Sequence, residues 1–310
     1  MPAALYALIV AVNPPSTPGP EERALSFLAR EAASWPVKNK CFSCHNNGDA
    51  ARALYSAVRL KRPVKPDDWA ATTRWLSRPA AWDHNGGEGP YNDKKLARLQ
   101  FAAALAEAME AGLITDREPL ARAAEWVAEL QGKDGSWQTE ADGGIGSPVT
   151  HGAPLATFLA RRTLARADAR KYAEAIARAD AWARQVPVKT VNAAAGVLLL
   201  LDRADDEAAR AQRKACLDLI RKGESRDGGW GPYVNSPPEA FDTAVVLLAL
   251  AVQTPSDETR AWTRRGRAYL IAAQRDDGSW RETTRPSGAD SYAQRLSTAG
   301  WATLALLATR

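Results

Sequence analysis

Three stretches of the chain end in Asp-Gly-x-Trp: Gln131-Gly132-Lys133-Asp134-Gly135-Ser136-Trp137, Glu224-Ser225-Arg226-Asp227-Gly228-Gly229-Trp230 and Gln274-Arg275-Asp276-Asp277-Gly278-Ser279-Trp280. The interval between the first two tryptophans is nearly twice the interval between the last two. Self-similarity at a period of roughly 20 to 50 residues indicates units that bury their apolar faces by stacking on one another. The chain is therefore predicted to be a repeat protein in which one unit, around residues 185–188, has lost the motif.

The composition of the heptapeptide predicts a structural role. Asp-Gly favours a tight turn, because Gly accepts positive φ and Asp bonds its own backbone. The Trp has a large apolar face to cover the end of the preceding helix, and the Gln amide can bond exposed helix-end groups. We predict that these side chains tie neighbouring repeats together: Gln131, Asp134, Gly135, Trp137, Asp227, Gly228, Trp230, Gln274, Asp277, Gly278 and Trp280.

Composition favours a single helical domain. Of the 310 residues, 45% are hydrophobic and 25% are charged, which gives ample material for a core. The formal charge of +5 is mild and the arginines are scattered along the chain, so nucleic acid is not indicated as a partner. We expect one domain over residues 21–310, after a signal-like or disordered segment over residues 1–20.

Helical segments alternate with loops rich in Gly, Pro and Asp, and their chemistry alternates too. The segment 257–274 is amphipathic and Arg-rich, whereas 238–252 is apolar nearly all round, and a helix that is apolar on all sides must be buried on all sides. Six buried and six covering helices predict an all-α (α/α)6 toroid, a double-layered barrel of six hairpins. The twelve expected helices are 21–34, 48–61, 66–78, 93–111, 117–131, 151–166, 168–185, 189–203, 205–222, 238–252, 257–274 and 290–309.

The N-terminal residues 1–12 form a short apolar run before a Pro-rich linker. Two interpretations stay open: a signal peptide shortened by a late start codon, or a frayed or packed tail. The run is too short to span a bilayer, and no other segment is an uninterrupted apolar run of that length, so no membrane span is predicted. With the first interpretation the protein is exported or periplasmic.

The three heptapeptides resemble the QW motifs of the terpene cyclase and protein prenyltransferase superfamily. The resemblance extends over about residues 66–310 and is specific, because three near-copies are present. It implies an (α/α)6 toroid with inner and outer helix rings and a cavity at one end. It also implies an apolar ligand of the isoprenoid or triterpenoid class.

The catalytic residues of that superfamily do not carry over. In the squalene-hopene cyclases, the proton donor belongs to an Asp-x-Asp-Asp motif, and the matching stretch here is Glu239-Ala240-Phe241-Asp242. Phe241 stands at the place of the central acid and cannot donate a proton. Glu239 and Asp242 are expected to cap the helix that begins there, as are Asp67-Asp68 and Asp205-Asp206 for theirs. No catalytic residue is assigned, and an enzymatic role stays undecided with a leaning against it.

Prenyltransferase β subunits hold zinc with Asp, Cys and His from inner-helix ends. Cys216 instead lies in the outer-type segment 205–222, next to Leu217 and Leu219, and is predicted to be a buried structural thiol.

The cluster Cys41-Phe42-Ser43-Cys44-His45 has the spacing of a c-type haem attachment motif. In that motif, two thiols form thioethers with the haem vinyl groups and the adjacent His is an axial iron ligand. The cluster lies in a polar loop, 38–49, expected in the first hairpin at the barrel end where a ligand would enter. We predict haem c at Cys41, Cys44 and His45, with zinc held by the same residues, or a metal-free loop, as the alternatives.

The two remaining histidines, His84 and His151, are expected at the same end of the barrel as His45, in consecutive repeats. Either one is a candidate sixth haem ligand or zinc ligand, beside the simpler role of loop or helix capping. The function expected from these features is a haem-linked redox, electron-transfer or sensing role, with a redox protein as partner. The alternatives are an enzyme or binder acting on an isoprenoid lipid, and a scaffold without chemistry.

Overall fold

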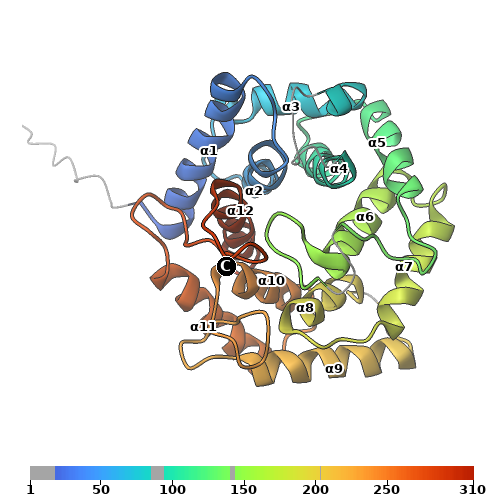
Figure 1. The fold of residues 1–310 in the computed structure, drawn as a ribbon, viewed down its shortest axis with the longest axis vertical. Coiled ribbons are helices and arrows are strands. Elements are labelled where there is room, and N and C mark those ends of the chain that lie inside the picture. The colour runs from blue at the N-terminus through green and yellow to red at the C-terminus, as the bar shows by residue number, and fades with distance from the viewer. Residues whose placement is uncertain (1–17, 85–93, 140–143, 203) are drawn as a thin grey trace, which may run out of the picture.

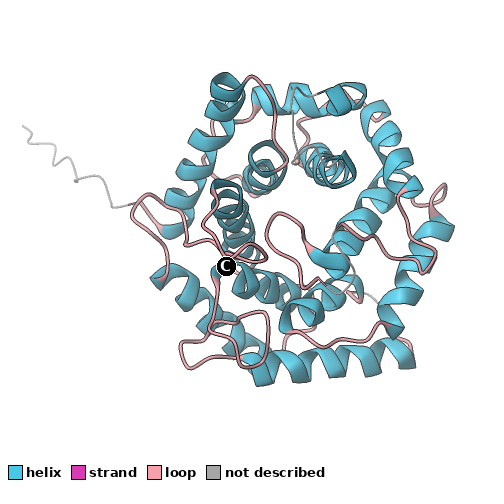
Figure 2. Cartoon of the chain, in the orientation of Figure 1, coloured by secondary structure: helices cyan, strands magenta, loops and turns pink. Residues whose placement is uncertain are grey.

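The computed structural model describes residues 18–84, 94–139, 144–202 and 204–310, and within these ranges the secondary structure is helical, with no strand. Helices alternate along the chain between an outer and an inner ring (Figures 1 and 2). The outer ring contains α1 (Pro20–Asn39), α3 (Ala70–Leu76), α5 (Glu118–Glu129), α7 (Ala173–Gln185), α9 (Glu207–Gly223) and α11 (Asp257–Ala272). The inner ring contains α2 (Ala51–Arg59), α4 (Lys94–Glu110), α6 (Gly152–Asp168), α8 (Val191–Leu200), α10 (Ala240–Ala251) and α12 (Tyr292–Ala308).

The predicted all-α (α/α)6 toroid is confirmed, and the helix bounds agree to within a few residues over most of the chain. Three differences occur in the first two repeats. Helix α1 continues through Pro36 to Asn39, α2 is preceded by a π-helix, η1 (His45–Ala50), and α3 is shortened by the 3-10 turn η2 (Pro66–Asp68). A second 3-10 segment, η3 (Pro79–His84), follows α3. Of the predicted signal-like or disordered segment 1–20, residues 1–17 lie outside the described residues, and Pro20 begins α1.

Burial explains the order of the rings. Along α8 and α10 nearly every side chain is buried, whereas α9 and α11 bury one stripe each and expose their arginines. The inner helices pack in sequence, and α12 contacts both α2 and η1, which closes the ring. At this closure, Gly300 lies so close to Asp49 that a Cβ atom would stand 3.0 Å from its carbonyl oxygen. Within the described part of the chain, no helix is both long and apolar enough to cross a membrane.

Each tryptophan of the repeated heptapeptide is buried and bonded to the helix that it follows. The indole N–H groups of Trp137, Trp230 and Trp280 donate to carbonyl oxygens of α5, α9 and α11 at 2.7–2.8 Å. The tryptophan thus completes the last turn of an outer helix, whose carbonyls have no partner within the helix.

The glutamines reach forward to the next repeat instead. Gln131 Nε2 donates to the carbonyl of Ala175 at 2.8 Å, in the first turn of α7, and Gln274 Nε2 donates to that of Pro20 at 2.9 Å. The third motif therefore joins the last outer helix to the first. Gly278, at φ +90°, lies so close to α1 that a Cβ atom would stand 2.2 Å from the carbonyl oxygen of Arg23.

Candidate functional site

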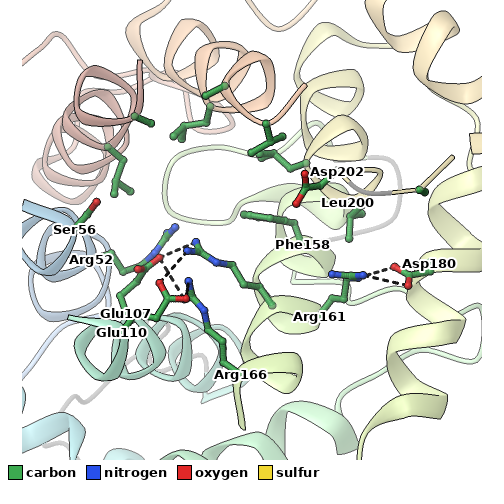
Figure 3. A pocket seen from close by; sticks show the side chains of 18 of the residues that line it. Arg52, Ser56, Glu107, Glu110, Phe158, Arg161, Arg166, Asp180, Leu200 and Asp202 are labelled. Atoms are coloured by element: carbon green, nitrogen blue, oxygen red, sulfur yellow. Dashed lines mark hydrogen bonds and ion pairs between the residues drawn. The ribbon is translucent and has the colours of Figure 1, made fainter. Parts of the chain in front are cut away.

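A cavity of about 760 Å³ lies among the last turns of the inner helices. One wall is apolar and comes chiefly from α8, α10 and α12, while the other is charged and comes from α2, α4 and α6 (Figure 3). The apolar wall includes Phe158, Leu199, Leu200, Leu248, Val252 and Leu304. The charged wall includes Arg52, Arg59, Glu107, Glu110, Arg161, Arg162 and Arg166.

Both glutamates of that wall are paired with its arginines. Arg162 approaches Glu107 at 2.7 Å and Glu110 at 3.5 Å, and Arg166 pairs with both carboxylates too (Figure 3). Burial by itself raises the pKa of Glu107, but the surrounding arginines, Arg162 first among them, outweigh it and hold the pKa below its usual value. Burial also lowers the pKa of Arg166, to about 10, so this side chain stays charged near neutrality. The wall is polar, with more arginines than glutamates, and Glu107 is ionised.

Arg52 of this wall also belongs to a central cluster of five buried side chains, which come from four repeats: Asp49, Arg52, Gln100, His151 and Trp301. The Arg52 guanidinium lies 4.7 Å from the Trp301 ring centroid and 3.4 Å from Asp49 Oδ1. His151 Nε2 lies 3.5 Å from the same carboxylate oxygen and 3.2 Å from Gln100 Nε2. The cluster links the charged wall, through Arg52, to the loop before α6.

His151 precedes α6 in a left-handed conformation, with φ 69°, and its ring is fully buried. A non-glycine residue rarely adopts this conformation outside tight turns, and here it turns the chain from the barrel centre into α6. Its side chain makes no cap bond to the helix. The predicted capping role of His151 is therefore wrong, because the ring is buried in the central cluster instead.

At the other end of α10, Asp242 and Arg285 form a buried ion pair. Arg285 donates to both Asp242 oxygens, at 2.8 and 3.0 Å, and also to Glu239 at 2.7 Å and to the Gly146 carbonyl at 2.7 Å. Asn192 donates a further bond to Asp242 at 2.8 Å. Arg285 thus joins the segment before α12 to the start of α10 and to the loop that crosses the barrel end before α6 (Figure 1).

These contacts correct the prediction that Glu239 and Asp242 cap α10. Glu239 is the N-cap residue but makes no side-chain cap bond, and Asp242 is fully buried and points to Arg285 and Asn192. Burial raises the pKa of Asp242 to about 6, against the opposing charge of Arg285. Phe241 packs edge-on to Trp301 at 5.9 Å. In the other two acidic pairs, one acid makes the predicted cap bond: Asp206 accepts from the Ala209 amide and Asp68 from the Lys65 amide.

The cysteine cluster lies between α1 and η1, where Cys41 and Cys44 are half-buried. His45 begins η1, and its ring lies edge-on to Trp35 at 5.2 Å and to Tyr292 at 6.0 Å. His45 Nε2 has essentially no accessible surface and no hydrogen-bond partner among the described residues. Burial lowers the pKa of His45 to about 4 despite the attraction of Asp49, so the imidazole is neutral at physiological pH.

The cysteine cluster and the cavity lie at different positions along the inner helices. The cluster precedes the first inner helix, whereas the cavity is lined by the last turns of the inner helices. Because the inner helices run in one direction, the cluster and this cavity lie toward opposite ends of the barrel. The prediction that the cluster lies at the barrel end where a ligand would enter stays a prediction.

The three histidines have different surroundings. His84 is exposed at the end of η3, His45 lies against Trp35 and Tyr292, and His151 belongs to the central cluster. Within the described ranges, no group of three His, Cys, Asp or Glu side chains is placed to hold a metal ion. Cys216 is buried in α9, and burial raises the pKa of its thiol to about 12, as suits a structural cysteine.

Sequence reasoning missed the charged wall of the cavity. The signal was present, because Glu107 and Glu110 are spaced i, i+3 and Arg162 and Arg166 i, i+4 near the ends of inner helices. Ionisable side chains on helices that are otherwise buried all round require partners or a cavity.

Comparisons with known proteins agree with this architecture, and the fold is a terpene cyclase-like α/α toroid. Residues 163–310, just under half of the chain, match the family described as squalene-hopene cyclase C-terminal domain. No curated protein matches the chain at a significant level.

Among solved structures, an arginine-to-alanine variant of the type II terpene cyclase MstE from Scytonema, with the substrate geranylgeranyl dihydroxybenzoate, has 14% identity and a TM-score of 0.56. The match covers 94% of this chain and 99% of that one. A protein from Actinoplanes gives 16% identity and a TM-score of 0.58, over 94% of this chain and 98% of its own. At these identities the likeness concerns the fold alone.

Proposed function

We propose that this protein binds an elongated, mainly apolar molecule of the isoprenoid class that carries one polar end. The observation behind the proposal is the division of the cavity into an aliphatic wall and a wall of paired charges. Its volume of about 760 Å³ falls in the range of small-molecule pockets, roughly 300–1,000 Å³. The apolar body lies along Leu248 and Leu304, and the polar end faces the arginines.

The chemical class follows from two sources. Burying apolar ligand surface against the aliphatic wall contributes about 25 cal/mol per Å², which favours a long hydrocarbon over a small polar metabolite. The type II terpene cyclase MstE, which has the same fold, was solved with a geranylgeranyl chain joined to a polar dihydroxybenzoate. A ligand of that general shape matches the two walls of the present cavity.

Binding is favoured over proton-initiated cyclisation. Protonation of an alkene requires a neutral acid within reach of the substrate. Glu107 in the cavity wall is held ionised by arginines, and Asp242 is locked by Arg285 at the opposite end of α10. Neither carboxyl group is arranged as a proton donor to a ligand in this cavity.

Titration calorimetry with geranylgeraniol tests the proposal, with the saturated C20 alcohol as a comparison ligand. We expect saturable one-to-one binding by the full chain. In Leu248→Trp the added ring fills part of the cavity and should weaken binding at least tenfold. The matched control is Ile271→Trp, which introduces the same side chain at an exposed position on α11, outside the cavity lining.

Two results would overturn the proposal. One is the absence of binding to geranylgeraniol and to geranylgeranyl dihydroxybenzoate by correctly folded protein. The other is equal weakening by Leu248→Trp and Ile271→Trp, which would place the ligand elsewhere. Incubation of either compound with the protein, followed by product analysis, should return it unchanged; a cyclised product would show that binding alone is an insufficient description.

A further inference from the structure

We propose that Cys41, Cys44 and His45 form a covalent haem site, with thioether bonds at the two cysteines and Nε2 of His45 as an axial iron ligand. This site is separate from the cavity. It lies at the start of η1, whereas Arg52, which lines the cavity, lies in the helix α2 that follows η1 directly. Seven residues of helical rise separate His45 from Arg52, about 10 Å. The proposal does not depend on an isoprenoid ligand.

The first structural argument is the state of His45. Its Nε2 is a buried polar atom without a partner among the described residues, although buried polar groups are nearly always hydrogen-bonded. Leaving such a group unsatisfied costs about 1–3 kcal/mol. An iron ion at Nε2 satisfies that atom, and Nε2 is one of the two ring atoms with which histidine ligates metals.

The second argument is the setting of the cysteines. Cys41 and Cys44 are half-buried in a short non-helical segment, whereas Cys216 is sealed in the core. A thiol must be reachable to add to a porphyrin side chain, so the first two cysteines are suited to attachment and the third is not. The segment between α1 and η1 also begins with Lys40 in a left-handed conformation, which ends α1 and turns the chain.

Aromatic side chains surround the site. Trp35 stacks on Tyr292 at 5.3 Å, and both rings flank His45. Phe42, between the two cysteines, stacks on Trp75 at 4.6 Å. Val37, two residues after Trp35, is 67% exposed. The two stacked pairs make the surroundings of the site aromatic and apolar, as a porphyrin edge requires.

Hydrogen bonds hold the frame around His45 in place. The Tyr292 hydroxyl accepts from Asn46 at 2.8 Å and donates to Glu31 at 3.0 Å. Asn46 also donates to the Glu31 carbonyl, and Asn47 donates to Thr72 at 2.8 Å. These bonds connect η1 to α1, α3 and α12 and therefore fix the start of η1, where a π-turn is a frequent mark of a functional site.

Attachment is balanced without an external oxidant or reductant. Each thiol adds across one vinyl group: sulfur bonds to the inner vinyl carbon, and the thiol hydrogen ends on the outer carbon. Both cysteines must be reduced when this occurs. Covalent haem attachment in bacteria takes place outside the cytoplasm, so the proposal includes export of the protein. Because Nε2 has no accessible surface, ligation requires the side chains packed around His45 to move apart.

The experiment is to export the full chain in a bacterial host with c-type haem maturation, and to measure the pyridine haemochrome spectrum and the intact mass. We expect one haem per chain that survives denaturation and maps to the peptide containing residues 41–45. Cys41→Ala/Cys44→Ala should lose all covalent haem. His45→Ala should keep thioether-bound haem with a shifted Soret band. Cys216→Ala is the matched cysteine control and should keep both mass and spectrum.

Circular dichroism of each variant establishes that it folds, so that loss of haem is not loss of structure. Folded wild-type protein without a haemochrome band or mass increment would overturn the proposal. So would haem that persists in the double cysteine variant, or stoichiometric zinc, in place of haem, that depends on the same three residues. Each of these results leaves the isoprenoid titration unaffected.

Discussion

Arg285 donates two hydrogen bonds to Asp242, at 2.8 and 3.0 Å, at the beginning of helix α10. The carboxylate is fully buried and the guanidinium nearly so. The same arginine bonds Glu239 and the carbonyl of Gly146. The side chain of Arg285 therefore connects the loops of three repeats across the end of the barrel.

Replacing Arg285 by Met should destabilise the protein by about 3–5 kcal/mol at pH 7.5, because it leaves the Asp242 carboxylate buried without its countercharge. The control is Arg265→Met. Arg265 also forms a two-point bond, to Glu224, but is half exposed, so its loss should cost less than about 1 kcal/mol. Chemical denaturation of both variants gives the comparison, and equal losses would show that burial of the pair is unimportant.

The pH dependence of stability should identify Asp242. Its pKa is raised to about 6 in the folded protein by burial, from a usual value near 4. The folded state thus binds the proton more tightly than the unfolded state. The stabilising contribution is fully present below pH 4 and is lost as the pH rises through 6. The difference in unfolding free energy between wild type and Asp242→Asn should therefore fall across this window.

Asp206→Asn is the control for that titration. The pKa of Asp206 is lowered to about 2 by its hydrogen bond with Arg184 and its cap bond, so its contribution changes only at more acidic pH. The free-energy difference between wild type and Asp206→Asn should be constant from pH 5 to 7. A flat profile for Asp242→Asn over the same range would contradict the raised pKa.

The fold could be predicted from the sequence because its signals are local. The heptapeptide ending at Trp137 carries its own turn chemistry, and the contrast between 257–274 and 238–252 separates outer from inner helices. Because the motif and the contrast between outer and inner helices repeat along the chain, the same prediction applies to several hairpins. The helix bounds could be predicted because Gly, Pro and Asp begin or end helices through local backbone effects that extend over a few residues.

The partner of Asp242 could not be predicted in this way. An acid at the start of a helix usually caps it, and Asp206 does so. Asp242 is instead the third residue of α10 and is fully buried, and its guanidinium partner is 43 residues further along the chain. Burial and long-range pairing depend on how the loops cross the barrel end. The position of the cavity depends on the same packing, which no local pattern encodes.

The indole hydrogen bonds of the repeated motif should contribute similar amounts to the free energy of unfolding in each repeat. Trp230→Phe and Trp280→Phe each leave a buried helix carbonyl unsatisfied and a small void, at a cost of about 2–3 kcal/mol. Trp137→Phe leaves a similar void, but the Val127 carbonyl keeps a bond from the Leu130 amide at 3.3 Å, so its cost should lie at the low end, about 2 kcal/mol. Trp126→Phe is the control, because this tryptophan is half-buried on α5 and contacts arginines instead, and should cost less than about 1 kcal/mol. Thermal or urea denaturation measures all four; a neutral effect at Trp230 would show that its bond is dispensable.

The close contact between Gly278 and α1 helps to close the ring. Comparing Gly278 with Gly112, which also has a positive φ but no close neighbour, distinguishes the effect of this contact from the effect of backbone strain. Gly278 has φ +90° and a Cβ atom there would stand 2.2 Å from the Arg23 carbonyl oxygen, whereas Gly112 has φ +73° and open space around it. Alanine at either position adds left-handed strain of roughly 1 kcal/mol. Only Gly278→Ala must also push α1 away, so it should cost about 2 kcal/mol more than Gly112→Ala in urea denaturation. Amide hydrogen exchange should then quicken in α1, next to the displaced contact, while Gly112→Ala leaves α1 unchanged. Equal stabilities and unchanged exchange in both variants would mean that the contact between the last motif and the first helix does not hold the ring together.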